Sequence, residues 1–181
     1  VRDLYRRTGP RGSVMASTVS LQKAVDPITY SAEFRNALGC FATGVTIVTC
    51  WDGLAPKGII ANSFASVSLV PPLVLWSPAK ASRRYEAFVN AEEFSIHILA
   101  QDQKHLCDAF LHNDTPFDDL EWHSDARGVP IISTCLARFD CHLQAQHDGG
   151  DHTILLGHVD HYQAKEGVPL VFSQGAYHIR A

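Results

Sequence analysis

The chain has 181 residues, of which 46% are hydrophobic and 19% charged, and its formal net charge is −4. This apolar content is too high for a disordered protein, and the length suits one domain with one sizeable core. The longest nearly apolar run, from Leu69 to Trp76, is interrupted by two prolines and is far shorter than the roughly 20 residues that a membrane-spanning helix needs.

Residues 1–14 are expected to lie outside the folded unit, as an added leader, a disordered tail or a native N-terminal extension. They carry four arginines against one aspartate and precede the only methionine, Met15. Their net charge of +3 leaves −7 for residues 15–181, which we expect to form a single domain. An acidic body without a basic stripe argues against a nucleic-acid partner, and no apolar signal-peptide core follows the arginines.

The five cysteines are an odd number, and no two of them have the C-x-x-C spacing. In a chain of this length without a secretory signal, that usage predicts reduced and mostly buried thiols. We therefore expect a cytoplasmic protein. The cysteines are Cys40, Cys50, Cys107, Cys135 and Cys141.

The first predicted element is a helix that begins near Ser31 as its cap and ends at Thr43-Gly44. Apolar side chains at helical spacing give it one apolar stripe. The stripe consists of Phe34, Ala37, Leu38 and Phe41. The β-branched run at 45–50 then predicts a strand, residues 58–61 begin a second strand, and residues 65–76 predict an extended pair.

The second half of the chain predicts more strands than helices. A short helix is expected at 82–89, a strand at 94–99 and a helix capped by Asp102, followed by a polar loop at 115–130. Three further strands are expected, at 137–145, 153–163 and 169–172. Short strands that do not alternate strictly with helices favour a mainly β Greek-key barrel with flanking helices over a doubly wound α/β fold.

The common nucleotide-binding glycine loops are absent from the sequence. No two glycines are separated by a single residue, which excludes the G-x-G-x-x-G fingerprint. Gly39 to Gly44 and Gly53 to Gly58 have the spacing of a P-loop, but Val45 and Ile59 stand where its lysine should follow. A nucleotide would therefore have to be bound in another way.

Histidines are frequent, and five of the ten crowd into residues 142–161 of the C-terminal third. They are His142, His147, His152, His158 and His161. Strand alternation places His158 and His161 on opposite faces, and a zinc site needs three or four converging ligands. We therefore expect surface or core histidines, with one in a catalytic or substrate-contacting role, and no metal site.

Three segments together resemble the short-chain flavin reductase family, the reductase components of two-component flavin-dependent monooxygenases. They read FRNALGCFATGVTIVT at 34–49, GIIANSFASVSLVPPLVL at 58–75 and GDHTILLGHV at 150–159. Residues 99–103 and 175–177 add shorter matches, so the resemblance covers nearly all of the chain from residue 34 onward. Two residues beside the expected flavin site depart from the family pattern: Ile60, where threonine is common, and Trp76, where a smaller residue is common.

The resemblance implies a flavin-binding split β-barrel, usually a homodimer, and exposed aromatic residues such as Trp76 or Trp122 would fit its interface. It also implies an activity, in which FMN or FAD is reduced by NADH or NADPH and the reduced flavin is released to a partner monooxygenase, commonly in aromatic or phenol degradation. Two alternatives remain: a flavoprotein with tightly bound FMN that reduces ferric or other acceptors, and a non-enzymatic flavin-binding protein.

The resemblance also implies where the flavin lies. Small and hydroxyl-bearing residues of the second segment let the backbone approach the ring and ribityl chain; they are Ile60, Ala61, Asn62, Ser63, Ser66, Val67 and Ser68. The phosphate is expected at a helix start, where free N–H groups and the positive dipole end bind anions. The cofactor-binding residues expected there are Ser77, Lys80, Ser82, Arg83 and Tyr85.

Hydride transfer asks little of side chains, because the cofactors carry the chemistry and the protein supplies orientation and exclusion of water. By resemblance, His152 is the catalytic residue at the nicotinamide side, where it can donate a hydrogen bond and favour an anionic reduced flavin. Tyr177 is expected as a second wall there, and Asp151 as the residue that fixes the turn. Arg83 and Arg84 could meet the 2′-phosphate of NADPH.

Overall fold

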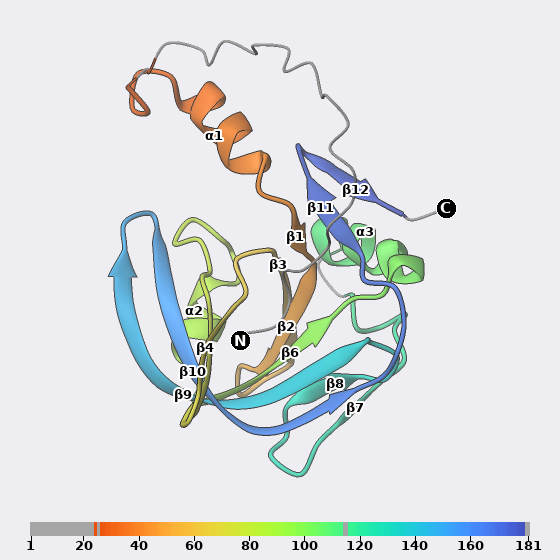
Figure 1. Cartoon of the computed structure of the whole chain (residues 1–181). Helices are drawn as coiled ribbons and strands as arrows, with labels where there is room; N and C mark the ends of the chain where they lie inside the picture. Colours follow the sequence, from red (N-terminus) through yellow and green to blue (C-terminus); the bar gives the residue numbers. More distant parts are fainter. Residues whose placement is uncertain (1–23, 25, 114–115, 180–181) are drawn as a thin grey trace, which may run out of the picture.

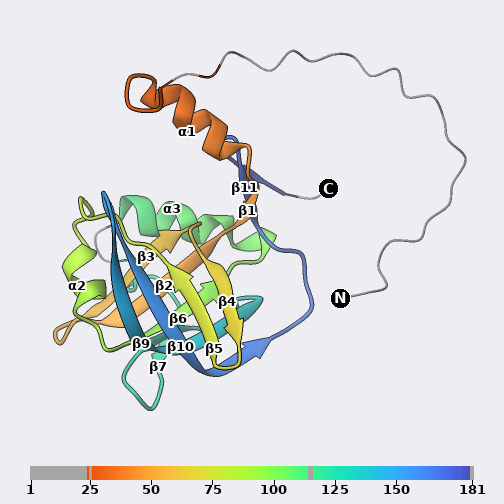
Figure 2. The same ribbon diagram turned by 60° about the vertical axis from the view of Figure 1, so that its left-hand side comes forward.

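The computed structural model describes residues 24, 26–113 and 116–179, so the expected leader at 1–14 lies outside the described residues. Most of this chain forms one antiparallel sheet of seven strands in the order β3-β2-β6-β9-β10-β5-β4 (Figures 1 and 2). The strands are β2 (Thr46–Trp51), β3 (Pro56–Ala61), β4 (Ala65–Leu69), β5 (Pro72–Trp76), β6 (Glu93–Ile98), β9 (Ala137–Gly149) and β10 (His152–Ala164).

The two edge strands of this sheet, β3 and β4, are consecutive in the chain. Only residues 62–64 join them, so the ends of the two strands lie no more than about 15 Å apart. The sheet must therefore curl until its edges meet, although β3 and β4 do not pair with each other among the described strands. The result is a split barrel with flanking helices, which confirms the predicted fold class.

Two apolar clusters fill the molecule. The first lies inside the barrel, where Trp76 packs edge-on against Phe88 and Phe94, with ring centroids 5.1 and 6.2 Å apart. The expectation that Trp76 is exposed at an interface was wrong, because its side chain on β5 points inward and is completely buried. The second cluster packs the other face of β2, which carries Ile47, against helix α3 (Lys104–His112).

Helix α3 is seated on the sheet through a close approach at Gly58 of β3. A Cβ at that position would overlap the ring of Phe110, so only glycine permits this packing. A 3-10 turn at Gln101–Gln103 precedes the helix, and Asp102 lies within it rather than at the cap. Gln103 takes the capping role instead, since its side-chain oxygen accepts the Ala100 N–H at 2.9 Å.

Helix α1 (Ser31–Gly39) stands clear of the barrel beside a small sheet of β1 (Thr43–Gly44), β11 (Val171–Ser173) and β12 (Ala176–His178) (Figure 1). Ser31 is the first helical residue, and no side chain caps the helix. The predicted apolar stripe exists but is exposed, because no other part of the described chain covers it. Its large members are exposed by 48% at Phe34, 59% at Leu38 and 79% at Phe41.

The expected polar loop at 115–130 contains a strand that periodicity did not reveal. β7 (Trp122–Ser124) pairs with β8 (Pro130–Ile132) across a tight turn, and the Trp122 indole N–H donates to the Phe117 carbonyl at 3.1 Å. The described cysteines are all free thiols, and only Cys40 is exposed. No helix of the described residues is long and apolar enough to cross a bilayer.

His97 of β6 is a completely buried ionisable group that bridges three elements. Its Nδ1 lies 3.1 Å from the Ile47 carbonyl, and its Nε2 lies 3.1 Å from the Ile132 N–H, which donates to it. The ring is therefore neutral, with its proton on Nδ1, because a protonated Nε2 would face another donor. Burial lowers the pKa of His97 from 6.5 to about 4.

This pKa difference makes stability dependent on pH. The unfolded chain binds a proton to His97 near pH 6.5, whereas the folded chain resists it down to about pH 4. The neutral, buried His97 therefore contributes fully to the free energy of unfolding above pH 6.5. This contribution is lost as the pH falls from 6.5 to about 4, and it amounts to roughly 3 kcal/mol. Denaturant unfolding at closely spaced pH values measures the slope. His97→Gln should remove it, and an equal slope in both proteins would contradict the assignment.

Candidate functional site

A cavity of about 220 Å³ opens where β3 ends, at the split in the barrel. Ile60 and Asn62 line it from the end of β3, and Tyr177 lines it from β12, more than one hundred positions later in the chain. Val45 and Phe172 complete the lining. Three of the residues expected at the cofactor therefore meet at one hollow with aliphatic and aromatic walls and one side-chain amide.

Tyr177 is held in this wall by packing. Its ring lies against Phe172 with centroids 5.2 Å apart, and the Lys104 ammonium lies 5.6 Å from the ring centroid. Burial, with the thiol of Cys107 beside the hydroxyl, raises the pKa of Tyr177 to about 12. The phenol is therefore neutral at ordinary pH and presents a flat apolar face with a polar tip.

Residues 62–64 are fastened to the end of β5 by a hydroxyl. The Ser77 N–H donates to Ser63 Oγ at 2.9 Å, and on the other side Thr46 Oγ1 donates to the Ala61 carbonyl at 2.7 Å. Phe64 is anchored by stacking on Phe139, with centroids 5.6 Å apart. The split in the barrel thus has a fixed backbone at the point where Ala61, Asn62 and Ser63 were expected to contact a ring.

The segment after β5 is docked against the turn between β9 and β10. The Lys80 N–H donates to the Asp151 carbonyl at 2.9 Å, and the Thr153 N–H donates to the Pro78 carbonyl at 3.1 Å. Tyr85, the first residue of α2 (Tyr85–Val89), shares a 2.7 Å hydrogen bond between its hydroxyl and Thr153 Oγ1. The two segments are therefore one unit, although they are far apart in the chain.

The residues predicted to bind the phosphate have different partners within this unit. Lys80 forms an ion pair with Asp148, which raises the pKa of Lys80 and lowers that of Asp148. Ser82 Oγ accepts the Arg84 N–H at 3.2 Å, within a turn that precedes α2. The expected helix start at Ser82 was thus placed too early, because the turn at 82–84 delays the helix to Tyr85.

The two neighbouring arginines have different surroundings. Arg84 donates to the carbonyls of Phe110 and Asn113, both at 3.0 Å, and thereby secures the end of α3. Arg83 is exposed and lines a separate hollow of about 520 Å³, which Arg84, Trp51 and Lys57 also line. The structure thus gives Arg84 a structural role and places Arg83 beside a hollow that Lys80 and Ser82 do not line.

His152 lies at the first position of β10, beside Ala79, and its side chain is 42% exposed. Its Nδ1 is 2.7 Å from a carboxylate oxygen of Asp151, and this hydrogen bond lowers the pKa of Asp151. Nε2 has no partner among the described residues, so it is the ring nitrogen available to a ligand. Gly150, at a φ of 78°, forms the turn that presents the imidazole.

The remaining expected residues lie on the free edge of the sheet. Ser66, Val67 and Ser68 belong to β4, where the pairing with β5 skips Val67. They do not line the 220 Å³ cavity, and Ser66 and Val67 are exposed. The edge strand carries their side chains and unpaired backbone groups along the rim of the split.

Several residues of the site were missed from the sequence. Asp148 and Thr153 are the partners of Lys80 and Tyr85, and Phe172 forms the cavity wall with Tyr177. The turn Gln174-Gly175 between β11 and β12 has positive φ at both residues, and its glycine is the local sequence signal for a hairpin at this place. The other two contacts depend on tertiary docking and leave no local pattern.

The arrangement suits a planar heteroaromatic ligand with an anionic tail. The cavity offers flat apolar walls, and the rim offers backbone groups and the Asn62 amide for the polar edge of a ring. Lys80 and Ser82 lie on the docked segment that follows the joint between Ser63 and Ser77. These residues fit a flavin, and the exposed His152 stands on the same docked unit.

Comparisons with known proteins agree with this geometry. The family model described as "Flavin reductase like domain" matches residues 38–180. "FMN reductase (NADH) SmoA" of Agrobacterium fabrum is 54% identical over 147 residues, covering 81% of this chain and 84% of that protein. "Flavin-dependent monooxygenase, reductase subunit HsaB" of Rhodococcus jostii is 40% identical, covering 86% of this chain and 78% of its own.

Solved structures share the fold. The Streptomyces globisporus NADH:FAD oxidoreductase, solved in complex with NAD and FAD fragments, superposes with a TM-score of 0.81 at 34% sequence identity. The match covers 88% of this chain and 97% of that one. The likeness therefore includes both the sheet and the segments that surround its split.

Proposed function

Because the chain belongs to the flavin reductase like domain family, we propose that it oxidises NADH, reduces FMN or FAD, and releases the reduced flavin to a partner monooxygenase. The observation that carries the proposal is the aromatic-walled cavity at the split of the barrel, which Ile60, Asn62 and Tyr177 line together. Beside the cavity, Ser63 is hydrogen-bonded to Ser77, and the segment that begins at Ser77 carries Lys80 and docks on the turn between β9 and β10.

When both cofactors are bound, a hydride passes from nicotinamide C4 to flavin N5, which gives NAD⁺ and the reduced flavin anion without a general base. The protein's own residues orient the rings and exclude water. We assign Ile60 and Tyr177 to the walls, and Ala61, Asn62 and Ser63 to the polar edge of the flavin. Ser66, Val67 and Ser68 on the β4 edge, with Ser77 and Tyr85 on the docked segment, complete the cofactor contacts.

Lys80 and Ser82 are assigned to the flavin phosphate, for which Lys80 must be shared with Asp148. Arg83 lines the separate hollow and is assigned to the outer part of a dinucleotide. We propose NADH as the donor, since SmoA and the Streptomyces globisporus oxidoreductase carry NADH in their names, and assign the enzyme to the NAD(P)H:flavin oxidoreductases. An aromatic substrate for the partner oxygenase is the setting that the family resemblance implies, and a cytoplasmic location fits the free thiols.

We also propose a homodimer, in which the apolar stripe of α1 is covered by a second copy. Phe34 and Leu38 are exposed on a helix that stands off the barrel, Phe41 is exposed just after its end, and such a patch is unfavourable in a monomer. Sedimentation as a monomer at micromolar concentration would contradict this assembly.

The reductase proposal is tested by steady-state oxidation of NADH, and separately of NADPH, with FMN or FAD titrated from zero. We expect saturable dependence on added flavin and little turnover without it, because the open cavity exchanges its ligand. Turnover that is independent of added flavin would indicate a prosthetic group. The absence of oxidation under all of these conditions would leave a flavin-binding protein and would overturn the proposal.

The phosphate assignment predicts a specific effect of charge at position 82. Ser82→Asp retains an acceptor for the Arg84 N–H but brings a negative charge toward the flavin phosphate, so the KM for FMN should rise at least about tenfold. Riboflavin, which lacks the phosphate, is the matched ligand and should show little change. Equal effects on both flavins would remove Ser82 from the phosphate site. Ser133→Asp, at an exposed serine elsewhere, controls for added charge.

The assignment of His152 to the nicotinamide side predicts that its removal affects kcat/KM for NADH more than flavin binding. His152→Ala should lower kcat/KM for NADH about tenfold or more, which is the loss expected for one hydrogen bond at the nicotinamide, and should weaken flavin binding less. His147→Ala, an exposed histidine of the same hairpin, serves as the control. The opposite ranking would move His152 to the flavin or to a structural role.

A further inference from the structure

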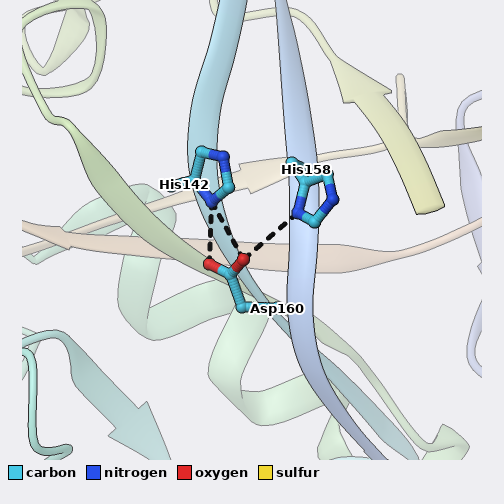
Figure 3. Close-up of side chains that lie close together, drawn as sticks. All are labelled: His142, His158 and Asp160. Atoms are coloured by element: carbon cyan, nitrogen blue, oxygen red, sulfur yellow. Dashed lines mark hydrogen bonds and ion pairs between the residues drawn. The ribbon is translucent and has the colours of Figure 1, made fainter. Parts of the chain in front are cut away.

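A second group of side chains lies on β9 and β10, away from the residues assigned to the flavin. His142 on β9 and His158 on β10 are direct partners across the ladder, and their imidazole rings stack with centroids 4.7 Å apart and planes 25° apart. Asp160 follows on β10 at a bulge, where the pairing steps from Val159 to His161 and leaves Asp160 as the additional residue. Figure 3 shows the carboxylate facing both rings.

The donor atoms of the three side chains converge. Nδ1 of His142 is 2.9 Å from each carboxylate oxygen of Asp160, and Nδ1 of His158 is 3.1 Å from one of them (Figure 3). One donor atom from each residue can be chosen so that all three lie within 4.8 Å of one another. Within the described ranges, no other set of three histidine, cysteine or carboxylate side chains meets this condition.

The carboxylate of Asp160 has an unusual environment for this protein. The two imidazoles are its only side-chain partners in the part of the chain that the structure describes. Asp140, on the neighbouring β9, is instead neutralised by Arg138 at 2.9 Å and Arg127 at 3.7 Å. Among the described residues, Asp160 thus has two imidazole nitrogens as its partners, where Asp140 has guanidinium groups.

We propose that His142, His158 and Asp160 bind one divalent ion of the zinc class, through both Nδ1 atoms and a carboxylate oxygen. Such ligands lie about 2.0–2.2 Å from zinc, which places neighbouring donor atoms roughly 3.3–3.6 Å apart in a tetrahedral site. The observed nitrogen–oxygen distances of 2.9 and 3.1 Å are hydrogen-bond lengths slightly below that separation, so a small movement of the side chains apart would admit the ion. Two imidazoles select zinc, nickel, cobalt or copper over magnesium and calcium, which prefer oxygen ligands.

The side chains leave room for an ion to enter and for a fourth ligand. All three are partly exposed, with 43% of the His142 side chain and 29% of each of the others accessible. A bound ion would cross-link β9 and β10, the longest strands of the sheet, beside the bulge at Asp160. The site is distinct from His152, which begins β10 six residues earlier and pairs with Asp151.

This proposal departs from the sequence-based expectation of no metal site. Strict alternation along β10, which would separate His158 from His161, does not hold here, because the bulge at Asp160 places His158 opposite His142 and His161 opposite Asp140; the second imidazole of the cluster comes from the opposite strand. The second histidine of the cluster is therefore found from the pairing register of β9 with β10, and spacing along one strand could not predict it.

The test is a zinc titration of the full chain after treatment with a chelator, followed by calorimetry and by thermal unfolding. We expect one zinc ion per chain, a rise in Tm with zinc, and no response to magnesium. Cobalt substitution should give the visible absorption of a four-coordinate site. The proposal is independent of the reductase activity, because none of these readouts involves a flavin.

Matched variants decide whether the binding belongs to this cluster. Asp160→Asn keeps the size and a hydrogen-bond acceptor but removes the charge, and His158→Ala removes one ligand; each should weaken zinc binding at least about tenfold. His147→Ala, an exposed histidine on β9 outside the cluster, should leave the affinity unchanged. Absence of zinc binding to the wild-type protein, or equal affinity in all three variants, would overturn the proposal.

Discussion

The constraint on which the rest of the structure depends is the three-residue link between β3 and β4. These strands are the opposite edges of a seven-stranded sheet, so a link of this length forces the sheet to close on itself without completing its hydrogen bonds. A complete barrel would fill its interior and present no opening. The split instead leaves β3 and β4 as edge strands, with a small cavity at the end of β3 that distant parts of the chain also line.

The functional surface follows from that opening. Residues 62–64 hold the joint, the segment after β5 continues from it, and the turn between β9 and β10 docks on that segment through backbone hydrogen bonds. Hydride transfer requires two flat rings held together more than it requires acids and bases, which is why the site is rich in backbone contacts and poor in charged side chains. Lys80, already paired with Asp148, is the principal cation of this unit.

Much of the fold could be predicted from local pattern. The β-branched run at 45–50 and the paired segments at 65–76 became strands because alternation and turn residues act over a few positions. The exposure of α1 could not be predicted, since an apolar stripe does not say whether its own chain or another covers it. Trp76 was wrongly expected to be exposed, because the face of the sheet that it occupies on β5 depends on the register between strands.

For the candidate site, the sequence proposed the segments but could not indicate the contacts between them. The meeting of Asn62 with Tyr177, and of Tyr85 with Thr153, depends on docking between distant parts of the chain. The measurement that most directly tests a flavin site at the split of the barrel is an NMR titration of the labelled protein with FMN. We expect amide shifts confined to residues 60–68, 77–85 and 150–153 and to the hairpin that carries Tyr177. Shifts confined to other surfaces, with these segments unchanged, would contradict a flavin site at the split of the barrel.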